Sequence, residues 1–526
     1  MSRFIIRITN YFFFAFIALF LFANIFWFSF SFIGGFWGYV LIAFMLVGVL
    51  IFFCFGERIF TKVRLVFSFL DKMSSLQMMA LLFVFIVLTK VILVFALGTE
   101  LNGRGDMPAY VSFAKQLAND GMITDDTFYA NMYKYTVVFS MFLSPVVKIF
   151  GGSIKVILVF VSILYAVITV VLFDIIRPYA GRKKSFLGLL LFNVFPVGLF
   201  ISQVVIHETA LLFFYVISFW LLLKAMNTKF HIALRALSLV LSAVLISFGA
   251  AINEGGKVVI IAYLIFALVY LFKDKISVKK IGKYIFTVLC YVICLLVITN
   301  ACVAFVSSHI RFSSDAEKSY SENAVSNRLW YSWKLFTGSN TESNGGFDGN
   351  DFKIYSEFYN IQNKEDAEEY QKTIVKDRLE YFWNNPLQIP RHLFLKFVWF
   401  YGKPFVTIEY SINTNLREWS NNLSGYPLLV LGALGNLYSI IIASMILFSY
   451  KKHKKDNIKN YINSGLQLKL FIVGLTLALI LFETSNKYVS HTQILLTCIA
   501  ILSINSFISN SNGLKNRVKQ ISRKKD

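Results

Sequence analysis

Acidic side chains stand where several long apolar runs of this sequence end. Asp106 lies shortly after a run that ends near Leu97, and Glu208, preceded by His207, and Glu254 lie at the ends of later runs. A carboxylate in such a place can act as a general base or as a ligand for hydroxyl groups. Charged groups at membrane depth are unfavourable and often functional, but at the end of a span the cost is small. Glu208 and Glu254 can therefore also be solvated turn residues.

Asp106 has a structural alternative of its own. The segment Met107–Asn119 is predicted to form an amphipathic helix, because apolar residues recur at helical spacing (Tyr110, Phe113, Ala114 and Leu117). Asp106 then stands at the N-cap, with Pro108 in the first turn. A capping residue needs no catalytic role.

The composition indicates a polytopic membrane protein. The chain has 526 residues, of which 57% are hydrophobic and only 15% are charged. Several runs reach the ~20 apolar residues that cross a bilayer. They recur up to the C-terminal region, so a single cleaved signal peptide cannot explain them. The five cysteines all lie in apolar runs and suggest neither a disulfide framework nor a metal site.

The basic residues predict the orientation of the chain. We expect twelve spans, at about 8–32, 36–55, 77–97, 154–176, 186–204, 209–224, 234–251, 256–272, 284–306, 427–449, 467–484 and 488–508. Lys and Arg concentrate in the connectors that share a side with both termini, which the positive-inside rule makes cytoplasmic. The net charge of +22 is therefore read as an orientation signal and not as a sign of nucleic-acid binding.

This topology divides the chain into five parts. They are two extra N-terminal spans with a basic loop (1–76), a core of spans (77–306), an outer cap loop (307–426), the last spans (427–508) and a basic tail (509–526). Residues 135–151, within the first outer loop (98–153), and residues 392–405 are predicted to be interfacial helices and not spans. In the cap, Asp348 and Asp351 are expected to be solvated turn residues, although calcium binding stays open.

The motifs, in their order along this topology, resemble a known superfamily. The helix after Asp106 has the form Y-x-x-x-A-x-x-L-x-x-x-G, with Tyr110, Ala114, Leu117 and Gly121 at the four positions. The same loop continues with Tyr133, Tyr135, Phe150 and Gly151. This order resembles the GT-C membrane glycosyltransferases, in the branch of the protein O-mannosyltransferases and the lipid A aminoarabinose transferase. Looser matches extend the resemblance over residues 77–508, at Asn193–Phe214, Asn253–Lys257 and Phe482–Leu496.

The resemblance implies an all-α membrane enzyme with interfacial helices in its first outer loop and a mostly α-helical cap. It would transfer a hexose or pentose from a polyprenyl-phosphate donor to an acceptor hydroxyl outside the cytoplasm, with inversion. Asp106 would be the general base. The abundance of Phe, Ile, Lys and Asn suggests a low-GC bacterium. We therefore expect a plasma-membrane enzyme whose acceptor is a cell-wall or surface glycopolymer or a glycolipid.

The expected site contains cations and polar ligands beside the base. Basic residues at predicted outer surfaces are candidates to bind the donor phosphate, namely Arg104, Lys134, Lys257, Arg311, Lys396 and Lys487. Binding of the sugar or the acceptor is assigned to Glu208, His207, Tyr110, Glu254, Tyr488 and His491. Each cation can instead extend its side chain to the membrane interface. No metal or other cofactor is expected, because a base and fixed cations suffice.

Two other functions stay open at this stage. An O-antigen-type polysaccharide polymerase or ligase has a similar number of spans and a large late outer loop, but would tolerate the loss of Asp106. A flippase or transporter of lipid-linked sugars would show internal repeats and polar breaks in mid-membrane, which we do not find.

Overall fold

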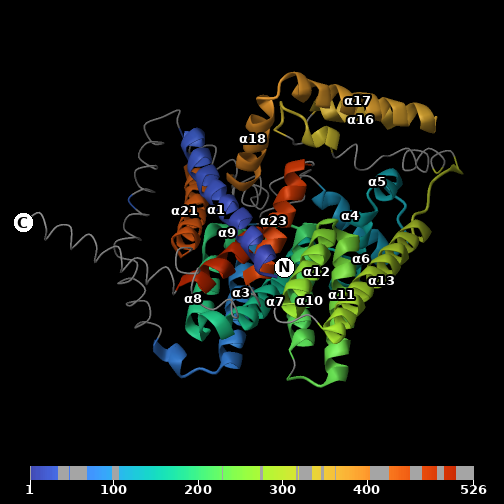
Figure 1. Cartoon of the computed structure of the whole chain (residues 1–526). Coiled ribbons are helices and arrows are strands. Elements are labelled where there is room, and N and C mark those ends of the chain that lie inside the picture. Colours follow the sequence, from blue (N-terminus) through green and yellow to red (C-terminus); the bar gives the residue numbers. More distant parts are fainter. Residues whose placement is uncertain are drawn as a thin grey trace, which may run out of the picture.

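The structure is a computed structural model of the whole chain. It describes residues 2–32, 47, 68–97, 106–227, 229–272, 277–315, 318, 335–344, 349–359, 361, 363–402, 426–449, 465–481 and 491–504. Within these residues the elements are helices, joined by turns and one isolated parallel β-bridge. Figure 1 shows a bundle of long helices with a cap of shorter ones across one end.

The bundle is built mainly from long apolar helices. They are α1 (Ser2–Phe32), α3 (Ser75–Leu97), α7 (Ile154–Ala180), α10 (His207–Met226), α11 (Ile232–Ile252), α12 (Gly255–Leu271), α13 (Val278–Ser308), α21 (Tyr426–Ser449) and α23 (Gly465–Leu481), followed by a last helix at Thr492–Ile504. Between residues 68 and 200 the chain also contains shorter elements, namely η1 (Ser68–Asp71), α4 (Met107–Asn119), α5 (Thr127–Met132), α6 (Lys134–Phe150), α8 (Arg182–Val194) and α9 (Pro196–Phe200).

Most of the predicted spans are confirmed as apolar helices. Seven helices among the described residues are long and apolar enough to cross a membrane, namely α1, α3, α7, α10, α11, α13 and α21. Three shorter apolar helices, α12, α23 and Thr492–Ile504, coincide with further predicted spans. The predicted span 36–55 lies outside the described residues. The all-α membrane architecture is thus confirmed, but the count of twelve spans is not.

The predicted span 186–204 is wrong as a continuous helix. It is broken into α8 and α9 at Phe195, whose backbone is extended (φ −70°, ψ 151°), and Pro196 starts α9. Proline removes a backbone donor and keeps the preceding residue out of the helical region. The Phe195-Pro196 dipeptide therefore explains the break. The chain then turns through residues 201–206 before α10 begins.

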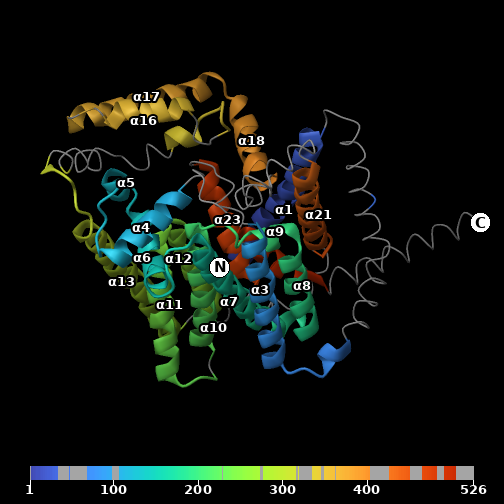
Figure 2. The same cartoon turned by 180° about the vertical axis from the view of Figure 1, so that it is seen from behind.

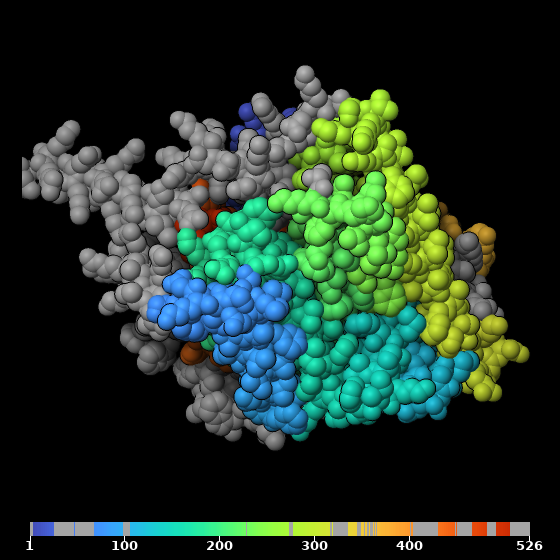
Figure 3. Space-filling model, turned by 90° about the horizontal axis from the view of Figure 1, so that it is seen from below, coloured from blue at the N-terminus to red at the C-terminus, as the bar shows by residue number. Residues whose placement is uncertain are grey.

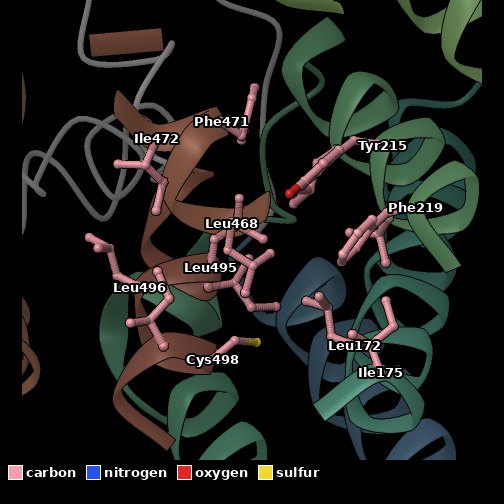
Figure 4. Packing of buried hydrophobic residues seen from close by; sticks show 14 of the residues in the cluster. Leu172, Ile175, Tyr215, Phe219, Leu468, Phe471, Ile472, Leu495, Leu496 and Cys498 are labelled. Carbon is pink, nitrogen blue, oxygen red and sulfur yellow. The ribbon is translucent and has the colours of Figure 1, made fainter. Parts of the chain in front are cut away.

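Tight packing between helices holds the bundle together. Figure 4 shows side chains of α7, α10, α23 and the last helix meeting in one apolar cluster, among them Leu172, Phe219, Phe471 and Leu495. Buried hydroxyl pairs add polar links between neighbouring helices. The Ser218 and Tyr263 hydroxyls lie 2.6 Å apart, linking α10 to α12. Such pairs and close van der Waals contact replace the hydrophobic driving force that lipid does not provide.

The ends of the helices far from the cap are tied by charged groups. Lys183, at the start of α8, pairs with Asp71 of η1, and Arg182 donates to the Met73 carbonyl (3.3 Å). Figure 3 shows this end of the molecule, where residues near 70 lie against the helices that follow α7. The turn between α10 and α11 also lies at this end, opposite the cap in both side views (Figures 1 and 2).

The first predicted outer loop folds as a compact unit at the cap end. Helix α4 packs on α6, and the Ser140 hydroxyl of α6 donates to the Tyr110 carbonyl (2.9 Å). The Gln116 side chain accepts from the Thr124 backbone (2.8 Å), which shapes the turn towards α5. Helix α6 has 17 residues and is not among the apolar helices that could span a membrane, as expected for 135–151.

The cap lies across one end of the bundle, and among the described residues it contacts α1 through α18 (Gln388–Gly402) and also packs on α5. It contains α16 (Gly349–Tyr359) and α17 (Lys364–Asn384), and α18 descends from them to pack on α1 (Figure 2). Asp351 was expected to be a solvated turn residue, which is wrong. Its carboxylate is buried and accepts from Arg378 (2.8 Å) and Asn340 (2.9 Å), so it is a structural ion pair. Asp348 lies outside the described residues.

The junction between the cap and α18 contains a buried lysine. Lys396 donates to the Gly338 carbonyl (2.7 Å), which is also 3.0 Å from Nε2 of His392. Burial lowers the pKa of Lys396 to about 7 from its ordinary value of 10.5. Burial also lowers the pKa of His392, so this group titrates at lower pH than the lysine.

We expect the junction to become more stable as the pH rises above 7. Between about pH 7 and 10.5 the unfolded chain binds more protons at Lys396 than the folded chain does, so stability increases with pH over this window. Hydrogen exchange of residues 335–340 and 388–396, corrected for intrinsic rates, should be slower at pH 9 than at pH 7. Lys396→Met should lose this difference, whereas Lys372→Met, at an exposed position of α17, should keep it. A difference that survives in Lys396→Met would contradict this account.

Candidate active site

Asp106 occupies the N-cap position of α4 but does not act as a cap. Its side chain makes no capping hydrogen bond. Instead, Oδ2 accepts from the Tyr110 hydroxyl (3.2 Å) and Oδ1 accepts from the Tyr129 hydroxyl of α5 (2.9 Å). The capping interpretation of this carboxylate is therefore wrong, and two phenols hold it instead.

The same tyrosine joins Asp106 to a second outer turn. The Tyr110 hydroxyl lies 2.6 Å from Nδ1 of His207, the first residue of α10. Nε2 of His207 lies 3.4 Å from a carboxylate oxygen of Glu208. The structure thus brings together four of the predicted site residues, Asp106, Tyr110, His207 and Glu208, which we call the Asp106 cluster. One short hydrogen bond thus joins Tyr110 to His207, which lies 97 positions later in the sequence.

Three residues of the Asp106 cluster are shielded from solvent, whereas Asp106 itself is partly exposed. Tyr110 is 1% exposed, and His207 and Glu208 are each 4% exposed. Aromatic rings enclose the imidazole, with ring centroids of Tyr135 at 5.3 Å and Tyr110 at 5.6 Å. Glu208 lies in the first turn of α10, where the helix dipole favours a negative charge. Neither of its carboxylate oxygens has a hydrogen-bond partner within the described residues, so both can accept from a ligand.

The electrostatics keep Tyr110 protonated. Burial raises its pKa well above the ordinary value, and the nearby groups Asp106, Tyr135, Glu208 and Tyr129 raise it further. A phenol has one proton, so Tyr110 donates either to Asp106 or to His207 at any moment. A carboxylate held by phenols in such a place is suited to accept a proton from a hydroxyl group.

His491 reaches the edge of this cluster from the end of the chain. Its Nε2 lies 2.9 Å from the hydroxyl of Thr209, the residue after Glu208, and its ring lies 5.9 Å from that of Tyr165. Lys487 and Tyr488 precede His491 by a few residues but lie outside the described residues, as does Arg104. Glu254 does not join the cluster through a described contact, since it pairs with Lys257 (3.1 Å) at a position where both are nearly half exposed.

The predicted phosphate-binding cations separate into different places. Lys134 and Arg311 line one cavity of about 700 Å³, together with Lys318, which the sequence analysis did not single out. Lys257 is engaged with Glu254, and Lys396 holds the cap junction. Among the residues that the structure describes, no three His, Cys, Asp or Glu side chains gather in a way that could hold a metal ion.

Comparison with known proteins supports a glycosyltransferase. Residues 134–301 match the dolichyl-phosphate-mannose-protein mannosyltransferase family. The resemblance to GT-C membrane glycosyltransferases is confirmed. The match covers α6 to α12 and most of α13 and includes His207 and Glu208, but it begins after Asp106. No curated protein and no solved structure matches the chain.

One residue that the sequence analysis missed is Lys90. It lies in α3 and is 1% exposed. Its ammonium donates to the carbonyls of Gly198 (2.5 Å) and Leu199 (3.4 Å), and the Gln203 side chain donates back to the Lys90 carbonyl (3.2 Å). The last carbonyls of a helix lack partners within it, so Lys90 completes the end of α9. The signal for it was a lone lysine inside an otherwise apolar run.

This contact ties together the two segments that carry the Asp106 cluster. Asp106 follows α3, and His207 follows the turn after α9. Helix α9 lies close against the end of α8, because a Cβ at Gly198 would lie 2.0 Å from the Phe192 carbonyl oxygen. We therefore expect Lys90 to act as a positioning residue for the approach of His207 to Tyr110.

We expect Lys90→Met to loosen the turn that presents His207 and to lower sugar transfer. The variant leaves buried carbonyls without a donor, which destabilises by about 1–3 kcal/mol. Hydrogen exchange at residues 198–209 should become faster than in the wild type. Lys469→Met is the matched control, since Lys469 is equally buried in a membrane helix, where it donates to Asn10 (3.0 Å). Faster exchange at 198–209 in the control, or unchanged exchange in Lys90→Met, would refute the positioning role.

Proposed function

We propose that this membrane glycosyltransferase transfers a sugar from a polyprenyl-phosphate donor to an acceptor hydroxyl, with Asp106 as the general base. The observation that carries the proposal is the Asp106 carboxylate itself, which does not cap α4 and accepts from two phenols, one of which also contacts His207. The family match supports it, since it favours a transferase over a polymerase or a flippase.

The reaction requires one proton acceptor and one stabilised leaving group. The acceptor oxygen attacks the anomeric carbon, its proton passes to Asp106, and the bond from that carbon to the phosphate oxygen breaks with inversion. The lipid phosphate leaves with the bonding electrons, so it needs cations and not an acid. Tyr110 and Tyr129 donate to the ionised carboxylate and orient it towards the acceptor.

The donor phosphate is assigned to cations that follow or precede the Asp106 cluster in sequence. Arg104 is two residues before Asp106, and Lys487 is four residues before His491, which contacts Thr209. An in-line displacement places the base, the acceptor oxygen, the anomeric carbon and the phosphate within about 10 Å of one another. Only residues near the cluster can meet this requirement, which favours Arg104 and Lys487 over Lys257 and Lys396.

The sugar hydroxyls are assigned to Glu208, His207 and His491. The two carboxylate oxygens of Glu208 can accept hydrogen bonds from hydroxyl groups, since no described residue donates to them. Buried polar groups without partners are unfavourable, so a ligand that supplies donors gains their full hydrogen-bond energy. Tyr488 is kept as a further ligand on the strength of its position before His491.

The cellular setting follows from the predicted topology. We propose that both termini are cytoplasmic, that the cap and the Asp106 cluster face outwards, and that the enzyme resides in the plasma membrane of a bacterium. Nucleotide sugars do not reach that side, so a lipid-linked sugar is the natural donor. The acceptor would be a surface glycopolymer or a glycolipid, and no metal is required by the scheme.

We expect Asp106→Asn to reduce sugar transfer by about 10²–10⁴-fold, the usual contribution of a general base. The amide keeps the shape of the side chain but cannot accept the proton. Mass analysis of the surface glycopolymers of cells with each variant, and transfer from labelled polyprenyl-phosphate hexoses by the purified enzyme, measure the effect. Asp120→Asn, at the exposed opposite end of α4, is the matched control and should retain activity. Sugar transfer by Asp106→Asn at the wild-type rate would contradict the proposal.

A further inference from the structure

A cationic cavity lies beside the Asp106 cluster and is separate from it. Its volume is about 700 Å³, within the usual range of small-ligand sites. Asn131 of α5 and Lys134 of α6 form one wall, Ser307 at the end of α13 forms part of the other, and the segment after α13 adds Arg311, Asp315 and Lys318.

The walls of the cavity are fixed to each other. The Lys134 ammonium donates to the Ser307 hydroxyl (3.0 Å), which joins α6 to the end of α13. The backbone of Arg311 donates to the Ile123 carbonyl (2.9 Å), and the Ile123 amide donates to the His309 carbonyl (2.7 Å). These bonds form the parallel bridge that ties the first loop to the end of α13, so Arg311 is carried by an anchored segment.

The lining of the cavity is suited to an anionic, hydroxyl-rich ligand. Among the described residues that line it are three cations, Lys134, Arg311 and Lys318, and one acid, Asp315. An arginine can bind two oxygens of a phosphate at once, and a lysine adds a mobile charge. Three serine hydroxyls and the Asn131 amide supply further partners, which suit a glycan better than a lipid chain.

The donor phosphate cannot occupy this cavity during transfer. Helices α5 and α6 present Tyr129 and Tyr135 towards the Asp106 cluster, with Tyr133 between them at ring distances of 4.7 and 5.9 Å. Asn131 and Lys134 of the same two helices face the cavity. Tyr129, Tyr133 and Tyr135, which we call the tyrosine wall, therefore separate the Asp106 carboxylate from the cations of the cavity. An in-line displacement leaves no room for side chains between the acceptor, the anomeric carbon and the phosphate.

We propose that this cavity binds a phosphate group of the acceptor, which is then a phosphate-bearing glycan. The inference rests on the proposed function, because it places the acceptor hydroxyl at Asp106. The phosphate would bind about one helix width away, roughly 10–12 Å, which spans one or two repeats of such a chain. Lys134 and Arg311, expected from the sequence to hold the donor phosphate, thereby become acceptor ligands.

The test is a binding measurement on the full-length protein in phosphatidylcholine nanodiscs. The probe is a short glycerol-phosphate oligomer, and a neutral oligosaccharide of similar length is the reference. We expect the protein to bind the oligomer and not the neutral chain. The double variant Arg311→Gln/Lys318→Gln should weaken binding at least tenfold, about 1.4 kcal/mol. Lys257→Gln, another outer cation, should leave the affinity unchanged, and added salt should weaken binding of the wild type.

The outcomes separate this proposal from the proposed function. Equal affinity of the wild type and the double variant would overturn the phosphate site. A second series uses nanodiscs that contain phosphatidylglycerol. If the double variant loses only the response to this lipid and binds the oligomer like the wild type, the cavity binds a lipid headgroup and the proposal is overturned. Asp106→Asn should still bind the oligomer while losing transfer. If Asp106→Asn transfers sugar normally and the double variant still loses the oligomer, the base assignment fails and the phosphate site stands.

Discussion

The hydrogen bond between Tyr110 and His207 is the contact on which the rest of this site depends. It is 2.6 Å long, it is buried, and it joins the first loop after α3 to the start of α10. Without it, Asp106 would be a turn residue near a membrane surface, and Glu208 an isolated acid at a helix N-terminus. With it, the partly exposed Asp106 carboxylate lies in one cluster with two buried Glu208 oxygens, to which no described residue donates a hydrogen bond. In such a place electrostatic interactions are stronger than in bulk water, which favours acid–base chemistry.

The surrounding fold keeps that contact in register. Lys90 donates to a carbonyl at the end of α9, and the Gln203 side chain donates to the Lys90 carbonyl. These two hydrogen bonds tie α3 to the turn before α10. On the other side, Ser140 holds the backbone of Tyr110, and the bridge between Ile123 and Ile310 anchors the loop to α13. These are polar contacts in a largely apolar bundle. A buried donor or acceptor is costly to leave unpaired, which makes the arrangement specific.

Much of the architecture could be predicted from hydrophobic pattern alone. Apolar runs of about 20 residues and basic connectors located most spans, because lipid imposes length and satisfied backbone bonds on every crossing. The pattern failed at 186–204, where Phe195-Pro196 breaks the helix. A hydropathy average does not register one proline, although the dipeptide itself predicts the break. The amphipathic helix after Asp106 was also predictable from its spacing and is present as α4.

The site was predictable in part. Asp106, Tyr110, His207 and Glu208 were named because of their types and their places at span ends, and the structure brings them together. Their hydrogen bonds were not predictable, since these depend on packing between distant segments. Lys90 was overlooked because a lone lysine in an apolar run gives no partner in sequence. For the same reason the sequence placed too many cations at the donor phosphate. In the structure Lys396 lies at the cap junction and Lys134 lies in a separate cavity.

The most direct test of this account is an experimental structure of the protein with a non-hydrolysable phosphonate analogue of a polyprenyl-phosphate hexose. We expect the anomeric carbon to lie within about 6 Å of the Asp106 carboxylate, which leaves room for one acceptor oxygen between them. Glu208 should then contact a sugar hydroxyl, and the phosphonate should lie on the same side of the tyrosine wall as Asp106. A sugar bound on the far side of that wall, or at the opposite end of the bundle, would contradict the account.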